Sequence, residues 1–258
     1  DDSPLLFTLD RAFTVTDRSL LKTYAVDDKG RIAKDLKPDF EAMATVAWQG
    51  SVWNLILGSG SKKGTRETGL LVSTSGPPVT HARDLAALYQ AFAALARFGS
   101  GLAVNIEAVA VADGRVYFFN RGNAGRNLLF KLPVAELMAY MTGQTKTVAD
   151  IQLHEARLPQ LQGKEAGFSG ADYWPEIHSL VYTASVEGSD NAYDDGAVLG
   201  SYLGLIPLSD LKAHAALDLS RSAKLLARGG VPLKTKVESV ALTHTESRRA
   251  QGALVSDN

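Results

Sequence analysis

Four copies of one short pattern constrain the fold of this chain more than any other feature. In each copy an extended apolar run, a turn and a second apolar run lead to a tight loop of small and polar residues. The first runs begin at 39–42, 105–108, 167–170 and 236–239, and the closing loops lie at 58–61, 120–123, 185–188 and 256–258. A lone strand pair cannot bury such apolar surface, so neighbouring units must stack. The pattern therefore predicts an all-β protein of repeated sheets.

We expect the repeats to form one domain, a β-propeller of five or six blades with short helical insertions, over residues 1–258. Strands with apolar residues on both sides, such as 116–119, suit sheets that pack face to face around an axis. Residues 1–4 read as the loop after a second strand, and 256–258 as another such loop, so both ends are expected to be cut within a blade. A β-sandwich with helical insertions is the alternative architecture.

The pattern also predicts individual elements. Runs rich in β-branched and apolar residues favour strands at 5–9, 23–26, 69–74, 128–132, 149–156 and 204–208. Apolar residues at helical spacing predict a helix that Thr80 caps and Gly99 ends. A second helix should run from Pro133 to Met141, where Gly143 follows as a stop, and a short helical piece is expected near 208–216.

Composition excludes several classes of function. The formal net charge of −1 gives no reason to expect nucleic acid as a partner, and no apolar run is long enough for membrane insertion. Cysteine is absent, which excludes disulfides, thiolate catalysis and zinc–sulfur sites. A protein without cysteine fits the periplasm and the cytoplasm equally, so the compartment stays open, as does the oligomeric state. A small-molecule ligand remains as the expected kind of partner.

If the fold is a propeller, polar residues from all four repeats meet on one face. The first strand starts on that face, and the turn after the second strand returns to it. The third residues of the first runs, which are 62 to 69 residues apart, are Glu41, Glu107, Ser169 and Glu238. The turns add candidate ligand-binding residues: Ser59, Asn120, Arg121, Glu187 and Asp257. We expect these side chains to line a polar funnel.

Several carboxylates in one funnel lose hydration and repel one another, so something must compensate for their charge. The simplest interpretation is structural, in which each glutamate accepts backbone hydrogen bonds from the next blade. A second interpretation makes Glu41, Glu107, Glu187 and Glu238 ligands of a cation, and Ca²⁺ is the one that prefers clustered oxygen ligands. A third gives the funnel direct chemistry, with Glu107 and Arg121 as the catalytic residues.

Short motifs resemble known families. The segment 105–111 with 120–123 resembles the strand and turn of uncharacterised bacterial propeller families, and 237–242 with 256–258 resembles part of the esterase-like phytase propellers. Segments 37–42, 58–61 and 194–201 resemble a bacterial family of unknown function within that group. The glycine that usually follows the family glutamate is alanine or serine here. The resemblance implies a propeller and kinship with hydrolases, but no established substrate.

Two hypotheses about function follow. The first is a ligand-binding or scaffold module with a polar funnel. The alternative is a hydrolase of a phosphoester or ester, in which a divalent cation polarises the scissile group and activates water while Arg121 steadies negative charge. Because no triad, metal signature or nucleotide motif is present, the sequence favours the first hypothesis.

Overall fold

A computed structural model describes residues 3–76, 79–100, 102–122, 126–188, 197–212 and 216–257 of the chain, the last without its side chain. Most of these residues lie in antiparallel strands, which confirms the expected all-β class. Three larger sheets each begin as a meander in which strands pair in the order in which they follow along the chain. This local pairing is what the repeated pattern of apolar run, turn and apolar run predicts.

The first large sheet contains β3 (Phe40–Trp48), β4 (Ser51–Gly58), β5 (Thr68–Ser73) and β6 (Thr80–Asp84). The second contains β7 (Ile106–Ala112), β8 (Arg115–Asn120), β9 (Asn127–Pro133), β10 (Gln152–Arg157) and the short parallel strand β16 (Leu217–Asp218). The third contains β13 (Gly167–Trp174), β14 (Ser179–Glu187), β15 (Val198–Pro207) and β17 (Lys224–Leu225).

Two longer hairpins stand at the ends of the chain. They are β1 (Leu5–Leu9) with β2 (Val15–Leu20), and β20 (Lys236–Glu246) with β21 (Arg249–Asp257). Two small ribbons pair β11 (Gln160–Leu161) with β12 (Lys164–Glu165), and β18 (Ala227–Arg228) with β19 (Val231–Pro232). The helical elements are α1 (Ala86–Ala96), α2 (Val134–Met141), η1 (Pro175–Ile177) and η2 (Leu208–Asp210). Within the described ranges, neither α-helix has the length and apolar character that a bilayer crossing requires.

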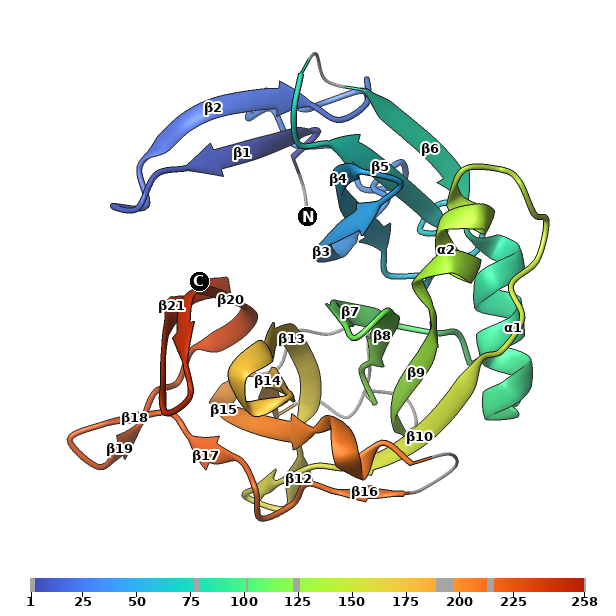
Figure 1. Ribbon diagram of the computed structural model, residues 1–258. Helices are drawn as coiled ribbons and strands as arrows, with labels where there is room; N and C mark the ends of the chain where they lie inside the picture. Colours follow the sequence, from blue (N-terminus) through green and yellow to red (C-terminus); the bar gives the residue numbers. More distant parts are fainter. Residues whose placement is uncertain are drawn as a thin grey trace.

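The sheets are arranged around a common centre, with their first strands innermost and α1 and α2 on the outside (Figure 1). Strand β7 contacts both β3 and β13, and β13 in turn contacts β20. In Figure 1 the arc is open between the hairpin β1–β2 and the hairpin β20–β21. The described residues therefore confirm stacked repeats, whereas a closed propeller and its number of blades remain predictions.

Large apolar residues fill the space between neighbouring sheets. Both faces of β8 are apolar because both are packed against a neighbouring sheet. Val116 and Phe118 belong to the cluster toward the first sheet, while Tyr117 and Phe119 belong to the cluster toward the third. On one side Phe92 of α1 stacks on Phe130, with ring centroids 4.2 Å apart. The prediction that 116–119 packs between two sheets is thus confirmed.

Two expected elements were wrong because tertiary pairing overrode local pattern. Residues 15–20, not 23–26, form the partner of β1, and in the later segment only Val26 makes an isolated bridge, to Ile32. Thr80 does not cap a helix: residues 80–84 pair with β5 as a fourth strand, and α1 begins after Leu85. The helical piece expected near 208–216 is the single turn η2 among the described residues.

Candidate functional site

The first strands β3, β7, β13 and β20 all carry a β-bulge at the same position of the repeat. In β3, Phe40 and Ala42 pair with adjacent residues of β4, which leaves Glu41 as the extra residue. The extra residues in the other three strands are Glu107, Ser169 and Glu238. A bulge breaks the alternation of a strand and re-aims the side chain that it carries. The four positions that the sequence pattern singled out are thus structurally equivalent, and we call them the bulge residues.

Close approach of two sheets accompanies the bulge in β13. A side-chain carbon added to Gly170, directly after Ser169, would lie 2.8 Å from the Cα of Ser239 on β20. Glycine at this place therefore lets the two first strands approach one another. Ser169 itself is buried and donates to the carbonyl of Val237 at 2.6 Å, with its Oγ 3.1 Å from Oγ1 of Thr183. Its role is to tie β13 to β20.

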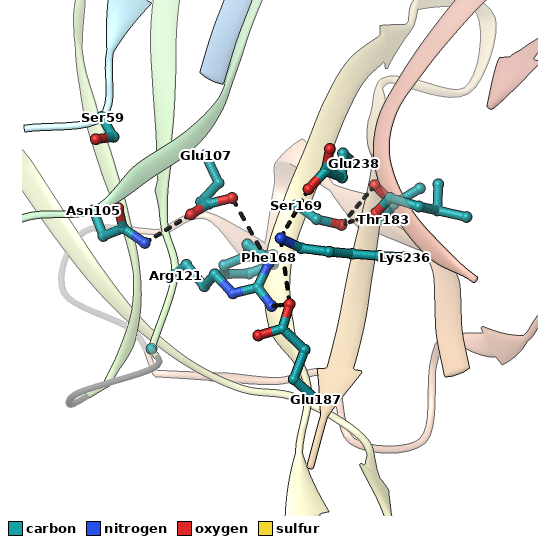
Figure 2. A network of polar contacts seen from close by, with 12 residues as sticks. Ser59, Asn105, Glu107, Arg121, Phe168, Ser169, Thr183, Glu187, Lys236 and Glu238 are labelled. Carbon is teal, nitrogen blue, oxygen red and sulfur yellow. Dashed lines mark hydrogen bonds and ion pairs between the residues drawn. The ribbon is translucent and has the colours of Figure 1, made fainter. Parts of the chain in front are cut away.

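Charged side chains from three sheets form one connected chain across the inner ends of the strands (Figure 2). Arg121, which follows β8, places one guanidinium nitrogen 3.0 Å from Glu187 and the other 3.7 Å from Glu107. Lys236 then contacts Glu187 at 3.3 Å and Glu238 at 2.8 Å. We call these five residues the charge chain. Its cations and carboxylates alternate, so each cation contacts two carboxylates and offsets part of their charge.

Arg121 is the most deeply buried member of the charge chain, since its side chain is 3% exposed. Its loop is held by the residues around it: its N–H donates to the carbonyl of Asn105 at 2.8 Å, and the Oδ1 of Asn120 accepts from the N–H of Asn105 at 2.7 Å. The Nδ2 of Asn105 also donates to Glu107 at 2.7 Å. Asn120 thus bonds the backbone of Asn105 and Arg121, and it is Asn105 that bonds Glu107.

Ser59 lies in a second polar cluster on the first sheet. Its hydroxyl donates to Asp39 at 2.7 Å, and the same carboxylate accepts from Arg66 at 2.6 Å and lies 3.3 Å from Lys37. Asp39 has a left-handed backbone, with φ of 56°, directly before β3 begins. The carbonyl of Ser59 also accepts the N–H of Ile106 at 2.8 Å and so joins the first sheet to the second.

Burial raises the pKa values of two of the bulge residues, Glu41 and Glu107. Desolvation, followed by the charges of Glu107, Asp39 and Glu238, raises the pKa of Glu41 to about 8. Desolvation also raises the pKa of Glu107, against the opposing charges of Arg121 and Lys236. For Lys236, burial lowers the pKa, but the hydrogen bond and charge of Glu238 and the charge of Glu187 outweigh it, so the pKa stands above its ordinary value. The lysine therefore stays charged.

A cavity of about 560 Å³ lies between the first strands β3, β7, β13 and β20 and the hairpin strand β1. Most of its wall is apolar, and its carboxyl groups belong to Glu41 and Asp172. Asp172 of β13 accepts the N–H of Leu242 at 2.6 Å and that of Tyr173 at 2.7 Å, while burial raises its pKa. The cavity is adjacent to the charge chain, since Ser239, which directly follows Glu238, lines its wall.

Of the predicted site residues, the structure brings together Glu107, Arg121, Glu187 and Glu238 in the charge chain, with Glu41 beside them. Ser59 and Asn120 lie close by but hold neighbouring groups, and the side chain of Asp257 lies outside the described part of the chain. The sequence interpretation missed Lys236 and Asp172. Lys236 could have been found, because a lysine two residues before Glu238 offers a nearby cation to one of the clustered carboxylates.

The backbone hydrogen bonds expected of the glutamates come from other residues. Ser169 and Ser201 bond the backbone around Val237, Asp172 bonds Leu242, and Asn127 bonds Ala166 and Phe168. The partners of Glu107, Glu187 and Glu238 among the described residues are the side chains named above. In the same ranges, His, Asp and Glu side chains form no group of three or more that could hold a metal ion. Calcium ligation stays a hypothesis.

The fold and the site define a mostly β protein of stacked antiparallel sheets, with a charged site at the bulges of their first strands and an apolar cavity beside it. The chain belongs to the Family of unknown function (DUF6929), whose model matches residues 1–258. This agrees with the expectation of a family without an assigned activity. A search of curated proteins found no match.

Proposed function

We propose that the protein is a small-molecule-binding module built as a β-propeller, with the cavity between its first strands as the binding site. The main support for this proposal is the cavity, which has a volume of about 560 Å³, a mostly apolar wall and a few polar groups at defined places. Ligand pockets in proteins have volumes of roughly 300–1,000 Å³ and this mixed lining. The radial order of β3, β7, β13 and β20 supports the propeller architecture.

Titration with the neutral apolar dye Nile red tests the binding function. We expect dye emission to rise and shift to the blue with saturation, because the dye leaves water for the apolar cavity. Ala241 lines the cavity and is exposed, so Ala241→Trp should fill the space and weaken binding by at least about tenfold. Ala47→Trp is the matched control, since Ala47 is also exposed, on β3, but lies outside the cavity wall. No saturable binding, or equal loss in both variants, would contradict the proposal.

A second candidate is the cation-assisted hydrolase of a phosphoester or ester. The observation in its favour is that Glu41, Glu107 and Glu238 lie close enough for the charges of the last two to raise the pKa of the first. A divalent cation bound by these carboxylates and Glu187 would relieve that repulsion, and Arg121 would stabilise negative charge on the substrate. Against it, three of the four carboxylates already contact Arg121 or Lys236.

Calorimetric titration of chelator-treated protein with Ca²⁺ decides between the two candidates. Under the hydrolase proposal, binding should be micromolar and should disappear in Glu107→Gln while the melting temperature changes little. Absence of binding up to millimolar Ca²⁺ would rule out the cation-assisted reaction and leave the binding module.

A further inference from the structure

The ionisable residues described in the cavity wall are all acidic. Among the described residues that line the cavity, Glu41 and Asp172 are acidic and none is basic, while the others are apolar or carry a hydroxyl group. Asp172 is held in place by two backbone N–H groups, so its carboxyl group has a fixed position in the wall. Carboxyl groups in an apolar wall disfavour anionic ligands, and they favour a cation because it stabilises their ionised form.

Glu41 differs from the other bulge glutamates in its contacts. Glu107 and Glu238, like Glu187 beside them, each contact a cation of the charge chain. Within the described part of the chain, Glu41 has neither a hydrogen-bond nor an ion-pair partner, although it lies on the cavity wall. A carboxyl group in this position can bond a ligand without first breaking a contact to any of the described residues.

The surroundings of Glu41 make a cation the matching group. The described charged groups that act on it are Glu107 on β7, Asp39 just before β3 and Glu238 on β20, and all three are carboxylates. Desolvation and these charges raise the pKa of Glu41 to about 8, so the group is mostly neutral at pH 7. A bound cation would offset the repulsion and allow Glu41 to ionise.

We propose that the cavity binds a small organic cation, an ammonium group attached to an apolar body, with the ammonium group at Glu41 and the body between the first strands. This inference rests on the proposed binding function and assigns its ligand class. The ammonium group would donate charge-assisted hydrogen bonds to the carboxylate of Glu41, which are stronger than bonds between neutral groups. Burial of the apolar body against the apolar wall would remove apolar surface from water and so add to the binding free energy.

Calorimetry with three compounds of matched size tests this assignment: 4-phenylbutylamine, 4-phenyl-1-butanol and 4-phenylbutyrate. We expect the amine to bind at least about tenfold more tightly than the alcohol and the carboxylate to bind most weakly. In Glu41→Gln the amine should bind no more than about threefold more tightly than the alcohol, while affinity for the alcohol is unchanged. Glu41→Asp, which keeps the charge, should retain a preference for the amine even if Glu41→Gln does not fold.

Glu155→Gln on β10 serves as the control, because it removes the charge of an exposed glutamate on an outer strand. It should leave the preference for the amine intact. Equal binding of amine and alcohol, or a preference that survives in Glu41→Gln, would overturn the cation assignment while leaving the binding function standing. If Nile red and all three compounds fail to bind, the binding function itself is wrong. Displacement of the amine by millimolar CaCl₂ alone would also contradict the assignment, because it would identify an inorganic cation as the better ligand.

Discussion

Glu41 and Glu107 occupy the same bulge position in the first strands of two successive sheets, and the charge of Glu107 is the strongest neighbouring influence that raises the pKa of Glu41. The repeat therefore places two like charges near one another. Glu107 has Arg121 and Asn105 as partners, whereas Glu41 faces the cavity. This asymmetry between equivalent positions underlies both the proposed site and the first prediction.

Replacement of Glu41 by glutamine should change how stability depends on pH. Because the pKa of Glu41 is raised from 4.5 to about 8, the folded protein binds an extra proton between these values. The stability that the neutral Glu41 side chain contributes is complete below pH 4.5 and is lost as the pH rises through about 8. Glu41→Gln imitates the neutral form, so its melting temperature should gain a few degrees on that of the wild type between pH 4.5 and 8.5. A constant difference in melting temperature between the two proteins over this pH range would show that Glu41 ionises normally.

Removal of Arg121 should destabilise the fold strongly. Arg121→Met leaves Glu107 and Glu187 partly buried without their shared cation, which costs about 3–5 kcal/mol in systems of this kind. Arg115→Met is the control, because Arg115 pairs with Asp150 near the surface and should change stability by less than about 1 kcal/mol. Unfolding in urea measures both variants, and similar losses would mean that the charge chain has no special structural role.

Gly170→Ala should weaken the contact between β13 and β20. The added methyl group would lie 2.6 Å from Oγ1 of Thr183 and 2.8 Å from the Cα of Ser239, so one strand must move. We expect a loss of about 1–3 kcal/mol from overpacking. Gly99→Ala, at a position with no atom within 4 Å of the added carbon, should be nearly neutral. Denaturant unfolding of the pair checks the expectation, and a neutral Gly170→Ala would contradict the close approach of these strands.

Ser169→Ala should remove one tie between the same two strands. The carbonyl of Val237 would lose the hydroxyl that bonds it at 2.6 Å, and an unsatisfied buried acceptor costs about 1–3 kcal/mol. Ser209→Ala, which alters an exposed serine in η2, should stay within about 0.5 kcal/mol of wild type. Faster hydrogen exchange at the start of β20 in Ser169→Ala, and not in Ser209→Ala, would locate the loss at the interface.

The local architecture was predictable because short-range pattern determines it. The spacing of the four polar third positions gave four equivalent strands, and the apolar run at 116–119 correctly indicated a strand packed on both faces. Gly143 follows the end of α2 as expected, since its backbone preference acts locally, whereas Pro133 lies just before the helix with extended backbone instead of in its first turn. The pattern failed at 23–26 and at Thr80, where the choice between strand, loop and helix depended on which neighbouring edge was free to pair.

The sequence alone predicted the all-β class, the repeat and the set of polar positions whose side chains meet, because periodicity and turn chemistry act over a few residues. Tertiary structure alone decided how those charges combine: Arg121 lies between Glu107 and Glu187, Lys236 enters the charge chain, and Glu41 is left facing an apolar cavity with Asp172. Bulges and the packing of one sheet on the next set these relations. Their energies depend on distance and burial, which residues of different sheets acquire only when the sheets stack.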